Sequence, residues 1–463
     1  MNNKRSIKPE KPDFEQIRRV VKNPKSRLHF IGIGGVSMSS LARLVKDFGT
    51  SVSGSDRESG QRTRALADSG AQIFIGHNER NVIGASLVVY THAIEDENPE
   101  LSFARANSIP TITRADLLGT LMLDYKGRIG VAGSHGKSTT VAMLDAIFSH
   151  AGCEPTTLSG ADLPFGDPMR RGQGDLLIYE ACEYRDSFLR FSPTIALGLN
   201  LEMDHPDYFK SLDHLKSSFT KALGRASVRT VISGDDHNLR DIKPKIKQSV
   251  TTFGFSEGND YRFFIDSYRQ GGFSFSLTRF GQEVGSFDLN IPGGFNLSNA
   301  AAAITVALEY GLDIKKVAEA IADFRGIPRR LEYLGEFFSR AVYYDYAHHP
   351  TEISSSINAL KSFTRGRLCV VFKPHTYSRT AALWNDFCSA LSLADSIIIT
   401  DIYPAREEPI NGITAENLAK SIDGAIYLPD SLVIEGLKHQ NCQTIALMGA
   451  GDMEVIKEGL ICK

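Results

Sequence analysis

Apolar residues recur along this chain with two different periods, and each period predicts a different element. Short uninterrupted apolar runs are typical of strands buried on both faces of a parallel sheet. Elsewhere apolar side chains recur three and four positions apart, as at Leu41, Leu44 and Val45, which indicates an amphipathic helix. Strand-like runs and helical stretches alternate, so we expect an α/β fold with parallel sheets. The apolar runs are residues 28–31, 176–179, 194–199, 368–372, 396–400 and 444–448.

One central segment departs from this pattern. Residues 272–277 alternate strictly between apolar and polar side chains, and residues 287–291 behave similarly. Alternation with a period of two predicts antiparallel strands with one buried face. We therefore expect an antiparallel hairpin added to the central sheet.

Three domains follow from the order of these elements in a chain of 463 residues. An Arg-rich link with Gly and Pro, residues 324–332, precedes the last series of strands, and a basic leader precedes the first. The two outer domains are expected to be Rossmann-like. The expected segments are a leader at 1–27 and domains at 28–126, 127–334 and 335–463.

Charge and cysteine content exclude several classes of protein. The formal net charge of −2 gives no reason to expect nucleic acid or an anionic membrane as a partner. Six cysteines without CxxC spacing indicate neither a zinc site nor a disulfide framework. No apolar run approaches the length of a transmembrane helix. We therefore expect a cytoplasmic protein without a membrane partner.

A Gly-rich turn in the middle of the chain carries the strongest chemical signal. Residues 128–132 are typical of an apolar strand, and residues 133–140 continue as GSHGKSTT into a helix. Backbone N–H groups in such a turn bind anions, a Lys reaches the outer phosphates, and the next hydroxyl can hold Mg²⁺. Val131 stands where the common P-loop has Gly, so the loop is an irregular one. The predicted P-loop-type nucleotide site consists of Gly133, Ser134, His135, Gly136, Lys137, Ser138 and Thr139.

A second Gly-rich turn follows the first apolar run, at Gly32, Gly34 and Gly35. Asp56 stands about twenty residues further on, which is the distance at which an acid binds a ribose in dinucleotide-binding folds. Ser37 occupies the position of the last glycine in that fingerprint. The turn predicts either a ligand that carries a diphosphate or a purely structural turn of a Rossmann sheet.

Acidic residues and a histidine follow two consecutive apolar strands of the central domain. Glu180 and Glu183 come after the run at 176–179, and His205 comes after the run at 194–199. The carboxyl ends of parallel strands lie at one edge of a sheet, so we expect these side chains beside the phosphate loop. Carboxylates and a neutral imidazole there can hold Mg²⁺, although each acid alone could cap a helix.

Further polar residues stand at the start of a helix and at strand ends later in the chain. Asn296 and Asn299 are three positions apart in a helix start, so both amides could face one ligand or simply cap the helix. In the third domain, polar loops follow the strands at 344–350, 374–380 and 401–407. Open α/β sheets bind their ligands at such loops.

Five blocks of this sequence resemble the Mur ligases. The resemblance extends from about residue 28 to residue 453, and the phosphate loop is similar to that of all members of the family. The other blocks resemble members that accept UDP-N-acetylmuramate, and the last block is most similar to members that add L-alanine. The blocks are HFIGIGG at 29–35, GSHGKSTT at 133–140, DH at 204–205, DYAHHPTE at 345–352 and PHTYSRT at 374–380.

The resemblance implies an ATP-dependent ligase that forms an amide between UDP-N-acetylmuramate and L-alanine. The first domain would hold the UDP-sugar, the second would hold ATP with Mg²⁺, and the third would close over both with the amino acid. ATP would phosphorylate the muramoyl carboxylate, and the amine of L-alanine would attack the acyl phosphate. Positioning and charge stabilisation dominate phosphoryl transfer, which suits a Gly-rich loop with a lysine.

The resemblance also implies roles for individual residues. Lys137, Glu183, His205 and His348 would be catalytic. The metal would bind Ser138, Glu183 and His205, with Glu180 as the alternative acid. The UDP-sugar would contact Gly34, Gly35 and Asp56, and Arg379 would contact the sugar substrate or alanine. Residues that would contact ATP outside the phosphate loop are Asn296, Asn299, Arg330 and Asp345.

Several positions depart from the usual pattern of the family. Ser37 stands where a glycine is usual, Ser138 where a threonine is usual, and Phe295 where a histidine is usual. Residues 182–186 read CEYRD in place of the usual acidic run, which is why Glu180 stays open as an alternative metal ligand.

Three other functions compete with this interpretation. A recycling ligase that attaches a preformed murein tripeptide to UDP-N-acetylmuramate would differ in its third-domain pocket. An NAD-dependent oxidoreductase would use the turn at Gly32 and Asp56, but it leaves the loop around Lys137 unexplained. A nucleotide-binding scaffold without activity would have no need of Lys137, Glu183 and His205.

Overall fold

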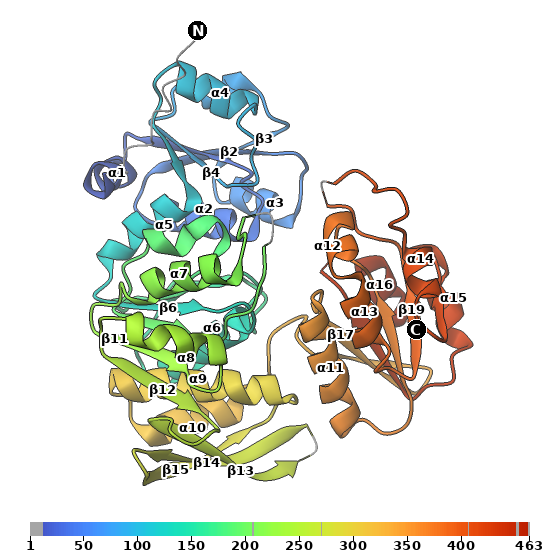
Figure 1. The fold of residues 1–463 in the computed structure, drawn as a ribbon. Coiled ribbons are helices and arrows are strands. Elements are labelled where there is room, and N and C mark those ends of the chain that lie inside the picture. The colour runs from blue at the N-terminus through green and yellow to red at the C-terminus, as the bar shows by residue number, and fades with distance from the viewer. Residues whose placement is uncertain (1–12, 206–207, 270, 406, 451–452, 462–463) are drawn as a thin grey trace. The chain divides into compact units, whose positions relative to one another are not determined.

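The computed structural model describes residues 13–205, 208–269, 271–405, 407–450 and 453–461, which form two compact units (Figure 1). The first unit consists of Met1–Asp162 and Asp167–Ser256. The second consists of Leu163–Gly166 and Glu257–Lys463. Each unit is described by itself.

The first unit begins with a 5-stranded parallel sheet in the order β3-β2-β1-β4-β5. Chain order reverses between β1 and β4, and ligands of open α/β sheets bind at the carboxyl ends of such a strand pair. The turn at residues 32–35 follows β1 and therefore lies at this place. The strands are β1 Arg27–Ile31, β2 Ser51–Asp56, β3 Gln72–Ile75, β4 Leu87–Tyr90 and β5 Thr111–Thr113.

Helices with one buried face pack against this sheet. In α2 the buried positions include Leu41, Leu44 and Val45, as the apolar spacing predicted. Three helices have side-chain caps, namely Asp13, Asn98 and Thr113, which accept hydrogen bonds from first-turn N–H groups. The helices are α1 Phe14–Val21, α2 Val36–Lys46, α3 Gln61–Asp68, α4 Pro99–Ala106 and α5 Arg114–Leu121, with short 3₁₀ turns at η1 Glu79–Val82 and η2 Met122–Asp124.

The second sheet of this unit has the phosphate-loop strand near its middle, in the order β12-β11-β10-β6-β9-β7-β8. All neighbouring pairs in this run are parallel except β7 and β8. Its strands are short and almost wholly buried, which agrees with their uninterrupted apolar runs. The strands are β6 Gly127–Ala132, β7 Thr156–Leu158, β8 Met169–Arg170, β9 Leu176–Glu180, β10 Ile195–Gly198, β11 Arg229–Ser233 and β12 Val250–Gly254.

One continuous core joins the two sheets of the first unit. Buried side chains from the first sheet, such as Phe30 and Leu41, belong to the same apolar cluster as Tyr179 and Phe219 around the second sheet. Burial of such side chains contributes roughly 25 cal/mol per Å² of apolar surface. The second sheet is covered by α6 Lys137–His150, α7 Leu212–Leu223 and α8 His237–Ile242, with 3₁₀ turns at η3 Tyr184–Arg190 and η4 Lys243–Lys245.

The second unit begins with the alternating segment. It forms a three-stranded antiparallel meander of β13 Tyr261–Arg269, β14 Gly272–Arg279 and β15 Gln282–Leu289, in place of the simple hairpin that we expected. The sequence pattern of β13 is less regular, because its second half is exposed. Two helices follow, α9 Gly294–Tyr310 and α10 Ile314–Asp323.

A 6-stranded sheet completes the second unit, in the order β16-β17-β21-β18-β19-β20. Only the edge strand β16 is antiparallel to its neighbour among these described strands. The strands are β16 Glu332–Phe337, β17 Arg340–Asp345, β18 Leu368–Phe372, β19 Ser396–Ile399, β20 Ala425–Tyr427 and β21 Thr444–Met448. The helices are α11 Pro350–Phe363, α12 Tyr377–Ala382, α13 Trp384–Leu391, α14 Ala415–Lys420, α15 Val433–Lys438 and α16 Glu454–Ile461, with a 3₁₀ turn at η5 Asp430–Leu432.

The α/β fold expected from the sequence is confirmed by these sheets. Each of the six apolar runs contains a strand, and the helices lie between them in the chain. Among the described residues, no helix is both long enough and apolar enough to span a membrane.

Candidate nucleotide and metal site

Three strand ends meet at the phosphate loop. Strand β6 pairs with β9 on one side and β10 on the other, with Val131 opposite Glu180 and Ala132 opposite Gly198. All three strands run in the same direction, so their carboxyl ends lie at one edge of the sheet. The expectation that acids after β9 and β10 lie beside the loop is therefore met by the topology.

The loop itself needs glycine at two positions. Gly133 has φ of 157° and Gly136 has φ of 82°, a region that side chains with Cβ atoms rarely adopt. A Cβ on Gly133 would also lie 2.9 Å from Cβ of Leu199. Gly136 is the N-cap of α6, so the chain turns sharply before Lys137 begins the helix. The N–H groups of this first turn are available to an anion.

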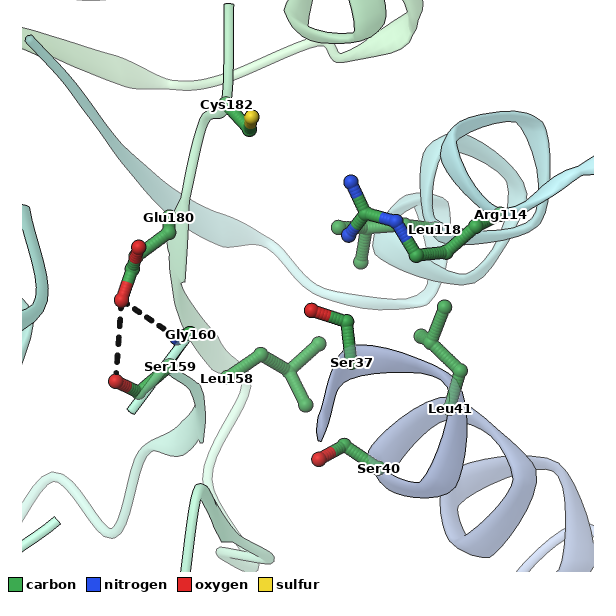
Figure 2. A pocket seen from close by; sticks show the side chains of 10 residues that line it. All are labelled: Ser37, Ser40, Leu41, Arg114, Leu118, Leu158, Ser159, Gly160, Glu180 and Cys182. Atoms are coloured by element: carbon green, nitrogen blue, oxygen red, sulfur yellow. Dashed lines mark hydrogen bonds between the residues drawn. The ribbon is translucent and has the colours of Figure 1, made fainter. Parts of the chain in front are cut away.

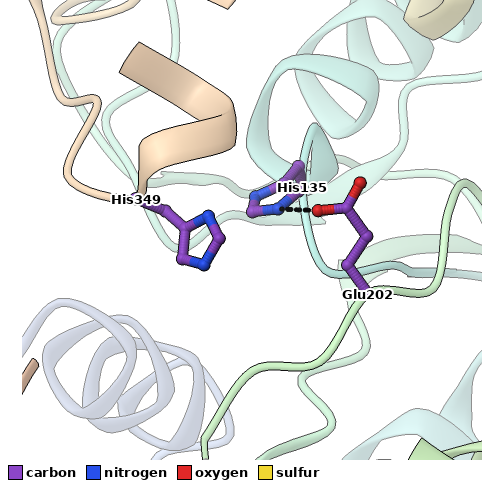
Figure 3. A group of neighbouring side chains, drawn as sticks. All are labelled: His135, Glu202 and His349. Atoms are coloured by element: carbon purple, nitrogen blue, oxygen red, sulfur yellow. Dashed lines mark ion pairs between the residues drawn. The ribbon is translucent and has the colours of Figure 1, made fainter. Parts of the chain in front are cut away.

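Side chains from the end of β10 hold the loop in place. Asn200 Oδ1 accepts from the His135 N–H at 2.8 Å, and Asn200 Nδ2 donates to the His135 carbonyl at 3.1 Å. Ser134 Oγ donates to the Glu202 carbonyl at 2.9 Å and accepts from the Glu202 N–H at the same distance. Figure 3 shows His135 Nε2 paired with the Glu202 carboxylate at 3.3 Å. The loop is thus preorganised by five polar contacts before any ligand binds.

Lys137 is mostly buried and faces a carboxylate. Its Nζ lies 3.1 Å and 3.2 Å from the two oxygens of Glu183, and it also donates to the carbonyls of Gly133 and Ser134. Burial alone lowers the pKa of Lys137, but Glu183, Cys182 and Glu180 together outweigh burial and raise it above the ordinary value. The lysine therefore keeps its positive charge, as binding to outer phosphates requires.

Glu183 also belongs to a group of possible metal ligands. Glu183, Asp204 and His205 each offer one ligand atom, and these atoms lie within 4.8 Å of one another. His205 Nε2 is 3.7 Å from an oxygen of each carboxylate. Glu183 is only 2 % exposed, so its charge is poorly screened by solvent. Two carboxylates and an imidazole of this kind suit a divalent cation.

The backbone around these ligands adopts uncommon conformations. Arg185 and Asp186, which follow Glu183, both have left-handed φ values of 50° and 57°, and His205 has φ of 53°. Residues with side chains in this region cost of order 1–3 kcal/mol and concentrate at functional sites. The Tyr184 ring lies 4.7 Å from the His205 ring and supports its orientation.

Glu180 makes different contacts from Glu183. Its Oε1 accepts hydrogen bonds from Ser159 Oγ at 3.1 Å and from the Gly160 N–H at 2.5 Å. Among the described residues, Glu180 is not a member of a group with metal-ligand geometry. The geometry therefore favours Glu183 over Glu180 as the metal acid, and this assignment stays a prediction.

The Gly-rich turn of the first sheet is linked to the acid expected near a ribose. The Gly34 N–H donates to Asp56 Oδ2 at 2.8 Å, and Asp56 Oδ1 accepts from the Arg57 N–H at 2.8 Å. Gly34, Gly35 and Asp56 are therefore brought together as expected. Asp56 stabilises the turn through these hydrogen bonds, and its contact with a ribose stays a prediction.

A buried carboxylate, Glu100 of helix α4, supports this turn. Glu100 accepts hydrogen bonds from Ser55 Oγ at 2.5 Å and from Asn81 Nδ2 at 2.6 Å, and His29 Nε2 lies 3.7 Å away. Burial alone raises the pKa of Glu100, but these three side chains outweigh burial and lower it to about 2. The Ser55 carbonyl accepts from the Gly32 N–H at 2.8 Å, so the network fixes the strand end beside the turn.

Glu100→Gln is expected to destabilise the protein by about 2–3 kcal/mol, because it removes a buried charge that satisfies several donors. The folded pKa lies below the ordinary value of 4.5, so the carboxylate contributes fully above that pH. This contribution is lost as the pH falls from there toward 2. Thermal unfolding from pH 7 to pH 3 should show a lower Tm at pH 7 and a weaker acid dependence in the variant. Unfolding curves with the same acid dependence in both proteins would contradict this role.

The second unit places Asp345 at the end of β17. Its carboxylate accepts hydrogen bonds from the N–H groups of Leu331 at 2.9 Å and Ala347 at 2.7 Å. Burial raises the pKa of Asp345 to about 6, although the positive charge of Arg330 acts in the opposite direction. The carboxyl group is thus easily protonated and sits in a rigid backbone cradle.

His348 lies in the loop between β17 and α11. Its Nδ1 is 3.0 Å from the Tyr346 carbonyl, which can only accept, so Nδ1 carries the proton and Nε2 is the basic nitrogen. Burial lowers the pKa of His348, and the Glu352 carboxylate, 3.4 Å from Nδ1, acts against this. A neutral imidazole of this kind can accept a proton.

Arg379 joins His348 through a second histidine. Arg379 Nη1 lies 3.3 Å from His375 Nδ1, and the rings of His375 and His348 are 5.9 Å apart. Burial, followed by the charge of Arg379, lowers the pKa of His375 to about 4. Arg330 lies over the Tyr346 ring at 5.3 Å, next to this group. The structure therefore brings Arg330, His348 and Arg379 together within the second unit.

Asn296 and Asn299 lie in the first two turns of α9 and are both buried. Asn296 Nδ2 donates to the Pro292 carbonyl at 2.7 Å, and Asn299 Nδ2 lies 3.5 Å from Asn296 Oδ1. These contacts join the two amides to each other and to the preceding loop, but the expected capping role is not found, because the N-cap is Gly293 and no side chain caps this helix. Contact with adenine stays a prediction.

Three residues of these sites were given no individual role from the sequence. Asp204 stands directly before His205 in the polar stretch after the run at 194–199, but only His205 was assigned to the metal. Asn200 lies two residues after β10, at the same strand end. His375 is part of the PHTYSRT block, but its contact with His348 depends on two distant strands.

A phosphate loop between parallel strands, together with two further α/β sheets, defines a class of multi-sheet nucleotide-binding proteins. Comparison with known families is more specific. Residues 27–126 match "Mur ligase family, catalytic domain", residues 131–307 match "Mur ligase middle domain", and residues 329–457 match "Mur ligase, glutamate ligase domain". The chain belongs to the Mur ligase family, which confirms the resemblance.

Curated relatives within this family are similar over most of their length. The UDP-N-acetylmuramate–L-alanine ligase of Caldanaerobacter subterraneus is 40% identical over 443 residues, which are 93% of this chain and 96% of the relative. The enzyme of the same name from Caldicellulosiruptor bescii is 41% identical, and the aligned residues are 85% of this chain and 87% of the relative.

Solved structures agree with these relatives. The UDP-N-acetylmuramate–alanine ligase of Thermotoga maritima has a TM-score of 0.80 at 27% identity. The superposition covers 94% of this chain and 98% of that chain. A murein peptide ligase from Psychrobacter arcticus has a TM-score of 0.72 at 23% identity, covers 94% of this chain and 98% of its own, and shares the fold.

Proposed function

We propose that this protein joins L-alanine to the carboxylate of UDP-N-acetylmuramate in an ATP-dependent reaction that releases ADP and phosphate. The proposal places it in cytoplasmic synthesis of peptidoglycan precursors. Its strongest support is the combination of a preorganised phosphate loop with relatives of that name at about 40% identity over most of the chain. We keep the division into segments 28–126, 127–334 and 335–463 for UDP-sugar, ATP and amino acid.

The phosphate loop binds the triphosphate of ATP in this proposal. N–H groups of the turn and of the first helical turn face the phosphate oxygens, and Lys137 moves from Glu183 to the outer phosphates. Because the loop is already fixed to β10 by Asn200, little reorganisation is needed when the nucleotide binds. Asn296, Asn299, Arg330 and Asp345 are assigned to other parts of ATP.

We assign Mg²⁺ to Ser138, Glu183 and His205, with Asp204 as an additional carboxylate. When bound, the ion neutralises charge on the phosphate oxygens. Glu183 would exchange Lys137 for this cation, so its buried charge stays compensated in both states.

The remaining residues orient the other two substrates. We assign the UDP end of the sugar nucleotide to the turn at Gly34 and Gly35, with Asp56 next to them for the ribose. His348 presents Nε2 as a proton acceptor for the amine of L-alanine, and Arg379 offers its guanidinium to a carboxylate. The amine then attacks the activated acyl carbon, and phosphate leaves.

The purified protein is expected to release phosphate from ATP only when UDP-N-acetylmuramate, Mg²⁺ and L-alanine are all present, because the acyl acceptor, cation and amine are each required for a complete turnover. A coupled phosphate assay with each component omitted in turn tests this requirement. Mass spectrometry of the nucleotide-sugar product should show the added alanine.

The same assay separates the proposal from the tripeptide-adding alternative. L-alanine is compared with glycine, L-serine and the murein tripeptide at equal concentrations. Turnover with the tripeptide that equals or exceeds turnover with L-alanine would overturn the assignment of the amino acid. Phosphate release that needs no UDP-sugar would overturn the ligase assignment altogether.

A further inference from the structure

A pocket of about 160 Å³ lies within the first unit, and Glu180 and Cys182 at the end of β9 are part of its lining. Its volume exceeds the roughly 30 Å³ that a water molecule occupies in the liquid, so it can admit a small acyl group. Figure 2 shows that the pocket is bordered by α2 and α5 on one side and by β7 and the end of β9 on the other. Its lining combines three leucines with a few polar groups. The leucines are Leu41, Leu118 and Leu158.

The cationic group of this pocket is the guanidinium of Arg114. It points into the pocket from the start of α5, with Glu180 and Cys182 on the opposite wall (Figure 2). Among the described residues, no carboxylate forms an ion pair with Arg114. The nearby Asp116 is engaged by Arg190 Nε at 3.2 Å and by Thr113. The guanidinium is therefore available to an anion from outside the chain.

The position of Arg114 in its helix is unfavourable for structural reasons alone. It is the first residue of α5, where the helix dipole is positive and a cation is destabilising by about 0.3–1 kcal/mol. A substrate anion bound there would reverse this effect. The location therefore argues for a binding role in preference to a stabilising one.

The pocket connects the two substrate regions of the first unit. Ser37, in the α2 turn that follows the Gly-rich loop, lines one end, and Glu180, at the end of β9, lines the other. Cys182, the chain neighbour of Glu183, lines the same end of the pocket as Glu180.

We propose that this pocket receives the lactyl group of UDP-N-acetylmuramate, with its carboxylate on Arg114 and its methyl group against the leucines. The inference rests on the proposed function and adds a specificity-determining residue to it. A guanidinium matches a carboxylate with two parallel N–H donors, and the leucines exclude water around the methyl group. Sugar nucleotides without the lactyl group leave Arg114 unpaired and bind less tightly.

The test compares two sugar nucleotides that differ only in this group. Isothermal titration calorimetry measures UDP-N-acetylmuramate and UDP-N-acetylglucosamine binding to the wild-type protein and to Arg114→Met. The variant is expected to bind UDP-N-acetylmuramate about 10- to 100-fold more weakly, because a charge-assisted hydrogen-bonded pair is lost. Its affinity for UDP-N-acetylglucosamine should stay within about 2-fold of wild type. Arg114→Lys keeps the positive charge but lacks the two parallel N–H donors, so it should restore part of the preference for UDP-N-acetylmuramate.

Arg105→Met is the matched control, because Arg105 pairs with Asp96 on an exposed surface of the same unit. It should leave both affinities unchanged. Thermal unfolding checks that each variant is folded. If Arg114→Met is not folded, Arg114→Gln is measured in its place. Equal loss of both ligands, or full retention of the preference, would overturn the role of Arg114. In that case wild-type turnover with all three substrates would leave the proposed function intact, whereas absent wild-type turnover would overturn both.

Discussion

Lys137→Ala is expected to lower ATP-dependent turnover by about 10³-fold or more, while UDP-sugar binding persists. The ammonium group is the mobile charge nearest the proposed position of the outer phosphates, and its loss removes stabilisation where charge develops during transfer. The truncation also leaves Glu183 without its nearest counter-charge, at 3.1 Å in the wild type. Breaking a buried pair of this kind destabilises by up to about 3 kcal/mol.

UDP-sugar binding is expected to persist in Lys137→Ala, because the residues assigned to the sugar nucleotide follow other strands. The turn at Gly34 follows β1 of the first sheet, whereas Lys137 follows β6 of the second sheet. Phosphate release and calorimetric binding of UDP-N-acetylmuramate are measured on the same preparation. Lys126→Ala is the control, because Lys126 lies just before β6 and pairs with Asp175 on the surface. Full turnover in Lys137→Ala, or loss of sugar binding in a folded sample, would contradict this partition.

Local sequence patterns predicted much of the fold. Apolar runs such as residues 444–448 marked buried strands because parallel strands covered on both faces contain few polar residues. Strand β13 was less visible, because its exposed second half lacks regular alternation. The order of strands in each sheet could not be derived in this way, since it depends on long-range pairing such as β17 with β21.

The candidate site was predictable where one segment carries it. The phosphate loop was recognised because the glycines, Lys137 and the following helix are contiguous in the chain. Contacts between segments that are distant in the sequence were harder to predict. The link between Glu100 and the Gly-rich turn passes through Ser55, about forty-five residues away in sequence, and the pocket around Arg114 is formed by four separate elements. Such contacts follow from packing and leave little local signal.

The choice between two acids illustrates the same limit. Glu180 and Glu183 stand three residues apart, and their sequence neighbourhood left both open as metal ligands. The structure directs them differently, because the chain turns after β9. Glu183 faces Lys137 and His205, whereas Glu180 accepts from Ser159 and the Gly160 N–H.

Glu183→Gln is therefore expected to lower turnover by about 10²–10³-fold and to raise the Mg²⁺ concentration needed for half-maximal rate. The substitution keeps the size of the side chain but removes the charge that the metal requires. Glu180→Gln is the matched control. Its amide oxygen can still accept from the Gly160 N–H, so the loss should be less than about tenfold.

Titration of the phosphate-release rate with Mg²⁺ separates the two acids, because a ligand changes the metal requirement whereas a structural acid changes only the maximal rate. Glu183→Gln should shift the half-saturating Mg²⁺ concentration upward, and Glu180→Gln should leave it unchanged. The reverse result would assign the metal to Glu180 and leave Glu183 as the resting partner of Lys137. In that case Lys137 would still be charged, since its pKa is raised chiefly by Glu183 in the absence of any metal. The metal titration thus tests the ligand itself, independently of the lysine.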